Sequence, residues 1–149
     1  MKNKIPIEKR LFLSLEQTSK IVREKVSEYL RSQDLKITFI QWLCLYEIYN
    51  SNGITQKNLA KALSKEEASV SRTIKKIISY QLIFKKKSID DKKSYQLHLS
   101  HSGLAFINEH ASKIHKLYKM VFSAIHEKEL HVISNILKRI NKKNDTKQE

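Results

Sequence analysis

The chain has 149 residues, enough for one domain of ordinary size and too few for two complete ones. Its only glycines, Gly53 and Gly103, are fifty residues apart, so no glycine-rich phosphate loop can form. This excludes the dinucleotide-binding and P-loop classes of protein. The 29 Lys and Arg exceed the 15 Asp and Glu and give a net charge of +14, which indicates a polyanionic partner, either nucleic acid or an anionic membrane surface.

The single cysteine permits no internal disulfide and no Cys-paired zinc motif, a usage typical of a reducing cytoplasm. No stretch approaches the roughly 18 apolar residues that a membrane span requires. The lysines near the N-terminus are not followed by the apolar segment of a secretory signal. We therefore expect a cytoplasmic protein without a membrane partner.

Residues 1–36 predict a long N-terminal helix. Its apolar positions are spaced by three and four residues, at Leu11, Leu15, Thr18, Val22, Val26 and Tyr29. A helix packed within a globule usually has a wider apolar face, and a narrow stripe is typical of paired helices. We interpret the stripe as part of a dimer interface; ordinary packing within one chain is the alternative.

Residues 37–101 predict three short helices followed by a β-hairpin. The first helix is expected from Ile37 to Asn50, with Asn52-Gly53 as its end, and the second from Thr55 to Leu63, with Thr55 as N-cap. Ser64-Lys65-Glu66-Glu67 has the form of a capping box, in which the Ser64 hydroxyl and the Glu67 carboxylate each accept from the other residue's amide. The third helix is therefore predicted to begin at Ser64.

The third helix has an apolar face and a cationic face. At about 100° per residue, Ile74, Ile77 and Ile78 lie close to Val70, whereas Arg72 lies on the opposite side. Small side chains let a helix approach the base edges of the major groove, and an arginine can bond to guanine O6 and N7. The candidate DNA-binding positions on this face and its flanks are Lys65, Ala68, Ser69, Arg72, Lys75 and Lys76. An ordinary solvated helix face is the alternative.

The segment after the third helix predicts a hairpin with a basic tip. Tyr95, Leu97 and Leu99 alternate with polar residues, as in a half-buried strand. The lysines before this strand are Lys85, Lys86, Lys87, Lys92 and Lys93. Residues 53–100 carry 11 basic and 4 acidic side chains, which is half of the net charge of the chain. Three helices followed by a basic hairpin are the winged helix-turn-helix arrangement.

Residues 102–142 predict the remaining dimerisation helices, and residues 143–149 a frayed tail. A spacing of three and four residues joins Leu104, Ile107, Ala111, Ile114, Tyr118, Val121 and Ile125, and it continues after His126–Lys128 at Leu130, Ile133, Leu137 and Ile140. The predicted fold is mainly α with a small β-hairpin. It is a single domain, residues 1–149, in which a winged module at 37–101 is flanked by dimerisation helices at 1–36 and 102–142.

Residues 37–103 resemble the MarR family of bacterial transcriptional regulators. The motifs that carry the resemblance are Ile37-Thr-Phe-Ile-Gln-Trp-Leu-Cys-Leu45, the segment from Thr55 to Leu63, Ala68-Ser69-Val70-Ser71-Arg72, Asp91-Lys92-Lys93 and Leu99-Ser-His-Ser-Gly103. The resemblance implies a homodimer, held by its terminal helices, that binds a pseudo-palindromic operator in double-stranded DNA, and it favours a repressor. It also implies that Ser69, Ser71 and Arg72 contact the groove and that Asp91 and Lys93 form a wing-tip pair.

Three residues depart from the family pattern. Lys92 and Lys93 stand where the family usually has arginine, and lysine lacks the planar guanidinium fork, so the wing is expected to attract phosphates more than it discriminates sequences. Gln81 stands where a helix-ending glycine is common. If its backbone is left-handed, Gln81→Gly is expected to stabilise the protein by up to about 1 kcal/mol.

No enzyme, cofactor or metal site is predicted. His110 and His115, and likewise His126 and His131, are five residues apart, which turns the second side chain about 140° away on a helix. A site formed by Glu109 and His110 with a ligand from another helix remains an alternative. Cys44 is interpreted as a core residue, with redox sensing as the alternative. The aromatic residues of the first winged-module helix, Trp42, Tyr46 and Tyr49, fit either the core or the wall of an effector cavity.

The preferred function is a sequence-specific transcriptional regulator that a small-molecule effector could release from DNA. No nucleophile, base and orienting residue are grouped in the sequence, so no catalytic residue is expected. Two alternatives stay open. The lysine-rich wing would suit a non-specific architectural protein, and the same fold could serve a metal or redox sensor.

Overall fold

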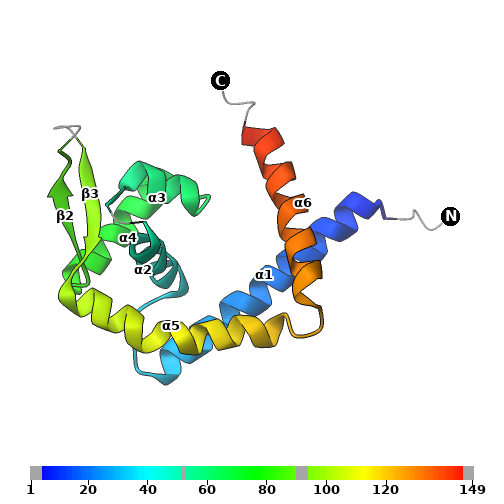
Figure 1. Ribbon diagram of the computed structural model, residues 1–149, viewed down its shortest axis with the longest axis horizontal. Coiled ribbons are helices and arrows are strands. Elements are labelled where there is room, and N and C mark those ends of the chain that lie inside the picture. The colour runs from blue at the N-terminus through cyan, green and yellow to red at the C-terminus, as the bar shows by residue number, and fades with distance from the viewer. Residues whose placement is uncertain (1–4, 52, 90–93, 146–149) are drawn as a thin grey trace. The chain divides into compact units, whose positions relative to one another are not determined.

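The computed structural model describes residues 5–51, 53–89 and 94–145, and Figure 1 shows the arrangement of its elements. Their order is α1 (Ile7–Ser32), α2 (Phe39–Asn50), β1 (Ile54–Thr55), α3 (Gln56–Ala62), α4 (Glu67–Ser79), β2 (Ile83–Lys87), β3 (Tyr95–Leu99), α5 (His101–Val121) and α6 (Glu127–Asp145). The chain divides into two compact units, Met1–Leu117 and Tyr118–Glu149. The predicted fold class, mainly α with a small β-hairpin in a winged helix-turn-helix, is confirmed. No helix in the described ranges has the length and apolar character needed to cross a membrane.

The sheet is antiparallel and has the strand order β1-β3-β2. β2 and β3 form the predicted hairpin, in register from Ile83 opposite Leu99 to Lys87 opposite Tyr95. The third strand, β1, was not predicted. It contains two residues, with Ile54 opposite Leu97, and so short a strand cannot show a period of two in the sequence.

The core of the winged module lies where α2, α3 and α4 meet β3. Trp42, Leu45, Leu59, Ile74 and Leu97 are each at most 2% exposed. Figure 1 shows these three helices grouped beside the hairpin. In α4 the buried residues Val70, Ile74 and Ile77 recur at the helical period, so the opposite face of this helix is oriented toward solvent.

A chain of aromatic contacts joins α1 and α5 to this module. The Tyr29 hydroxyl is hydrogen-bonded to Nδ1 of the buried His110, at 2.9 Å. The rings of His110 and Phe106 lie 4.7 Å apart, and Phe106 lies 6.3 Å from Trp42 on α2. The winged module is thus attached to α1 and α5 through side chains that come from three different helices.

Three helices end in left-handed residues that are not glycine. Asp34 after α1, Ser64 after α3 and Gln81 after α4 have φ values of 53°, 51° and 60°. After α4, the Gln81 amide donates to the Ile78 carbonyl and the Leu82 amide to the Ile77 carbonyl, which is the Schellman pattern. Gln81 therefore meets the condition on which its stabilisation by glycine was predicted, a left-handed backbone.

The capping box predicted at Ser64 is wrong. Ser64 belongs to the end of α3, where its amide donates to Lys61 and the next amide donates to Ala60. α4 begins at Glu67 with Glu66 as N-cap, and no side-chain cap bond forms. The serine satisfied the sequence pattern, but the tight α3–α4 turn requires a left-handed residue at that position.

The capping box of the fold lies at the start of α2. The Thr38 hydroxyl accepts from the Gln41 amide and the Gln41 side chain accepts from the Thr38 amide, at 3.4 and 3.0 Å. α2 therefore begins at Phe39 and not at the predicted Ile37. Thr55 caps α3 as predicted, because its hydroxyl accepts from the Asn58 amide at 3.2 Å.

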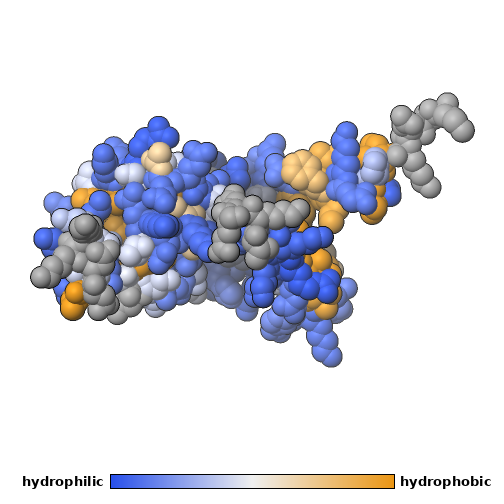
Figure 2. Space-filling model, turned by 90° about the horizontal axis from the view of Figure 1, so that it is seen from above, coloured by the Kyte–Doolittle hydropathy of each residue, from blue (hydrophilic) through white to orange (hydrophobic). Residues whose placement is uncertain are grey.

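The terminal helices bury less of their apolar stripes than a packed helix would. In α1 the buried residues are Val26 and Leu30, whereas Ile7 is 63% and Phe12 is 59% exposed. Figure 2 shows apolar surface over this exposed part of α1. The buried line of α5 is Gly103, Ile107, His110 and Ile114, so it includes a histidine and omits the predicted Leu104. α6 has no buried residue, and it runs to Asp145, into the segment predicted as a frayed tail.

Candidate nucleic-acid interface

The cationic face of α4 is solvent-exposed. Val70, Ile74 and Ile77 are buried against the core, and Ile78 is half-buried, as the helical period predicts. The exposed candidates are Lys65, Ala68, Arg72, Lys75 and Lys76, and the half-buried ones are Ser69 and Ser71. None of the salt bridges between described residues includes a lysine or arginine of this set. The face therefore offers its charges to a ligand.

One lysine of this face has an aromatic partner. The Lys76 ammonium lies 5.2 Å from the centre of the Tyr80 ring, where a cation–π contact holds it over the last turn of α4. Lys65 stands two residues before the first residue of the helix. The two lysines thus flank Arg72 from opposite ends of α4.

The hairpin carries three exposed lysines on its first strand. Side chains alternate between the two faces of a strand, so Lys85 and Lys87 point to one face and Lys86 to the other. Lys85 lies opposite the buried Leu97, on the face toward the helices. Lys86 shares the outer face with Phe84 and His98, whose rings stack at 5.6 Å. Asp91, Lys92 and Lys93 lie outside the described residues.

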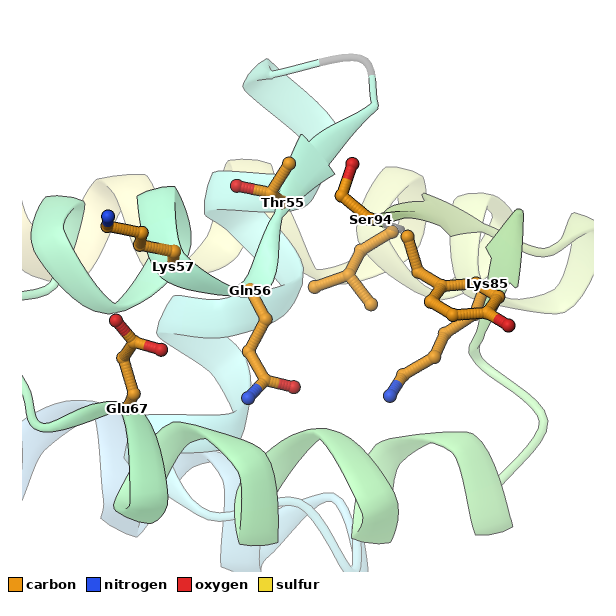
Figure 3. Close-up of a pocket in the computed structure, with 8 residues that line it drawn as sticks. Thr55, Gln56, Lys57, Glu67, Lys85 and Ser94 are labelled. Atoms are coloured by element: carbon orange, nitrogen blue, oxygen red, sulfur yellow. The ribbon is translucent and has the colours of Figure 1, made fainter. Parts of the chain in front are cut away.

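A cleft of about 410 Å³ separates the start of α4 from the hairpin. Its lining residues come from β1, α3, α4 and the hairpin, and they are Thr55, Gln56, Lys57, Glu67, Lys85, Ser94, Tyr95 and Leu97. Figure 3 shows Glu67 rising from the start of α4 toward α3, with Lys85 reaching into the same space from the hairpin. The cleft brings one predicted wing residue, Lys85, beside residues that sequence reasoning missed.

No pattern in the sequence groups the cleft residues that were not predicted. Gln56 and Lys57 lie in the first turn of a short helix, and Tyr95 and Leu97 follow them by about forty residues. They meet because β1 pairs with β3, which places the start of α3 beside the hairpin. Glu67 was assigned to a cap that does not form.

The remaining candidates, which are Cys44, His110 and the aromatic residues of α2, differ in how deeply they are buried. Cys44 is fully buried, and desolvation raises the pKa of its thiol to about 12, so the thiolate needed for redox chemistry is strongly disfavoured. Burial also lowers the pKa of His110, although Glu109 opposes this effect. Trp42 is buried, whereas Tyr46 and Tyr49 are about half-exposed on α2. No three His, Cys, Asp or Glu side chains group into a metal site within the described ranges.

Comparisons with known proteins agree with this geometry. The MarR family model matches residues 37–95. The MarR/EmrR family transcriptional regulator from Acinetobacter sp. ADP1 superposes with a TM-score of 0.83 at 20% identity, covering 95% of this chain and 99% of that one.

Two similar structures contain DNA. A mutant MarR from E. coli complexed with operator DNA has a TM-score of 0.76 at 20% identity, over 88% of this chain and 93% of that one. The S. aureus MepR–DNA complex has a TM-score of 0.73 at 22% identity, over 94% of this chain and 99% of that one. Residues 37–95 therefore match the MarR family model, and the chain has the winged-helix fold of these solved structures.

Proposed function

We propose that the protein is a sequence-specific transcriptional regulator that binds double-stranded DNA as a homodimer. The observation that carries the proposal is the exposed cationic face of α4, beside a hairpin with three exposed lysines. The opposite face of α4 is buried in the core, so the helix presents this one face in a fixed orientation. A helix with these properties fits the major groove, and a basic hairpin beside it fits the neighbouring phosphates and minor groove.

The residues of α4 divide into base-reading and positioning roles. Arg72 is central on the exposed face and would bond to guanine, while Ser69, Ser71 and Ala68 leave room for the backbone to approach base edges. Lys65, Lys75 and Lys76 would contact phosphates. The wing would contribute Lys85, Lys86 and Lys87, and at its tip Asp91, Lys92 and Lys93, as positioning and charge.

The exposed apolar residues of α1 and α6 support the homodimer. On α1, Ile7 and Phe12 are 63% and 59% exposed, and on α6 Val132 is 56% exposed. Apolar surface of this extent is typical of an interaction surface. A symmetric dimer would present two copies of α4 to successive major grooves about 34–36 Å apart. Sedimentation is expected to give twice the 17.5 kDa mass of one chain.

We further propose that the protein represses transcription in the cytoplasm and that a small effector can release it from DNA. Occupation of an operator by a dimer blocks access to the promoter, which makes repression the simplest outcome of binding. Tyr46 and Tyr49 offer exposed aromatic surface for an effector, with ring centres 6.2 Å apart. Native mass spectrometry of the purified dimer would show a retained ligand or metal, and a retained metal would favour the sensor alternative.

The test begins with a duplex selected from a randomised library by the full chain. Binding to this duplex and to a random duplex is then measured by fluorescence anisotropy at fixed salt. Arg72→Ala is expected to cost about 1–3 kcal/mol on the selected duplex and much less on the random one. Lys86→Ala is the control and should weaken both duplexes alike. Equal affinity of the unaltered protein for both duplexes would contradict the proposal and favour an architectural protein.

A further inference from the structure

One carboxylate of the winged module lies at a position where DNA would approach. In the described part of residues 53–100 the acidic side chains are Glu66 and Glu67, and both are exposed at the start of α4. Of the two, Glu67 lines the cleft between α4 and the hairpin, and Glu66 does not. The neighbouring cations that line the cleft are Lys57 and Lys85.

The Glu67 carboxylate makes no cap hydrogen bond and no salt bridge with another described residue. The capping box that would have used it is absent, because Ser64 closes α3 instead. No salt bridge among the described residues includes Glu67, although Lys57 and Lys85 share its cleft. Figure 3 shows its side chain projecting into the cleft and not along the helix axis. Its charge therefore remains available to a molecule that enters the cleft.

The proposed function determines which part of DNA would enter the cleft between α4 and the hairpin. With α4 in a major groove and the hairpin at the adjacent minor groove, the strand that separates the two grooves must pass between them. The cleft occupies this position, and its lysines and hydroxyls suit phosphate oxygens. A carboxylate at the same place repels a phosphate. Glu67 thus acts against the sequence-independent part of the binding.

The position of Glu67 also limits this repulsion in a matched complex. Residues at the N-terminal end of a recognition helix are those that contact base edges, and Glu67 is the first residue of α4. Carboxylates accept hydrogen bonds from the amino group of cytosine in the major groove. A half-site that presents this group can satisfy Glu67, whereas a random sequence leaves it facing phosphates alone.

We propose that Glu67 is a specificity-determining residue, which lowers affinity for non-cognate DNA by repelling phosphates in the α4–hairpin cleft and accepts a base amino group in the cognate complex. This inference rests on the proposed function. The lysines of the winged module attract phosphates of any sequence. The Glu67 carboxylate reduces that attraction wherever the bases do not match.

The test compares Glu67→Gln with Glu66→Gln in the full chain. Both substitutions remove one exposed charge from the same turn of α4, so the second controls for net charge and for the helix dipole. Anisotropy titrations use the duplex selected by the unaltered protein and a random duplex of equal length. Glu67→Gln is expected to raise affinity for the random duplex about three- to fivefold, the size of one exposed charge interaction. Affinity for the selected duplex should fall or stay unchanged, so the ratio of the two affinities decreases.

The control defines the result that would overturn the inference. Glu66→Gln should change both affinities by the same factor and leave their ratio unchanged. An unchanged ratio for Glu67→Gln, or an equal decrease for Glu66→Gln, would overturn the role of Glu67 and leave the proposed function intact. If the unaltered protein already binds both duplexes equally, the proposed function fails and the inference fails with it.

Discussion

Gln81 occupies a conformation that ordinarily favours glycine, and Gln81→Gly is expected to stabilise the protein. The φ of Gln81 is 60°, and its side chain is exposed. Left-handed backbone costs an L-residue about 1–2 kcal/mol relative to the right-handed form. Glycine avoids this cost but loses about 0.5–1 kcal/mol more conformational entropy on folding. The expected net gain is therefore about 0.5–1 kcal/mol.

The backbone contacts at this position do not depend on the side chain. The Gln81 carbonyl accepts from the hydroxyls of Ser100 and Ser102, at 2.6 and 2.8 Å, and its amide donates to Ile78. Glycine can keep all three bonds. The substitution thus isolates the conformational strain of one residue between α4 and β2.

Urea denaturation at equal protein concentration measures the effect, since the stability of the proposed homodimer would depend on concentration. The matched control is Gln17→Gly, the same substitution at an exposed position inside α1, which should destabilise by about 1 kcal/mol. Thermal melting should show opposite shifts of a few degrees, about 2–4 °C for each kcal/mol. A lower denaturation midpoint for Gln81→Gly would refute the reasoning, because it would mean that the left-handed backbone is not strained.

Three other outcomes follow from buried groups. Gly103→Ala should lower the melting temperature by several degrees, because the new Cβ would collide with the Leu82 carbonyl oxygen. Burial lowers the pKa of His110, so its contribution to stability is present above about pH 6.5 and is lost as the pH falls through the lower folded pKa. His110→Gln should flatten the decline in urea midpoint between pH 7 and pH 5, and an equal decline in both proteins would refute the assignment. Cys44, with a thiol pKa of about 12, should react with iodoacetamide at pH 8 only after unfolding, so rapid labelling of the native protein would contradict its burial.

The elements that the sequence revealed are those whose signal is local and periodic. The apolar face of α4 follows from the spacing of Val70, Ile74 and Ile77, and β3 follows from the alternation around Leu97. Ser64 shows the limit of such signals. A serine three residues before a glutamate fits a capping box, yet the short α3–α4 turn demanded a left-handed residue and overrode the local preference.

The cleft could not be predicted, because it depends on long-range pairing. Ile54 lies opposite Leu97, and this pairing across more than forty residues brings the start of α3 beside the hairpin. The candidate lysines were identified from charge and from the period of each element, which indicate a surface but not how residues of different elements face one another. The geometry that separates Lys85, beside the cleft, from Lys86, on the outer face, appears only when the register of the sheet is known.

The composition of the module sets a particular problem for sequence discrimination. Arg72 is the single arginine among residues 53–100, while lysines supply the other ten basic side chains. Lysines attract phosphates of any sequence, and their combined attraction raises non-cognate and cognate affinity together. In the proposed complex, selectivity would come only from the few groups proposed to contact bases, namely Arg72, the small residues beside it and Glu67. Reducing non-cognate affinity is then as effective as adding a base contact, because the genome offers a vast excess of competing sites.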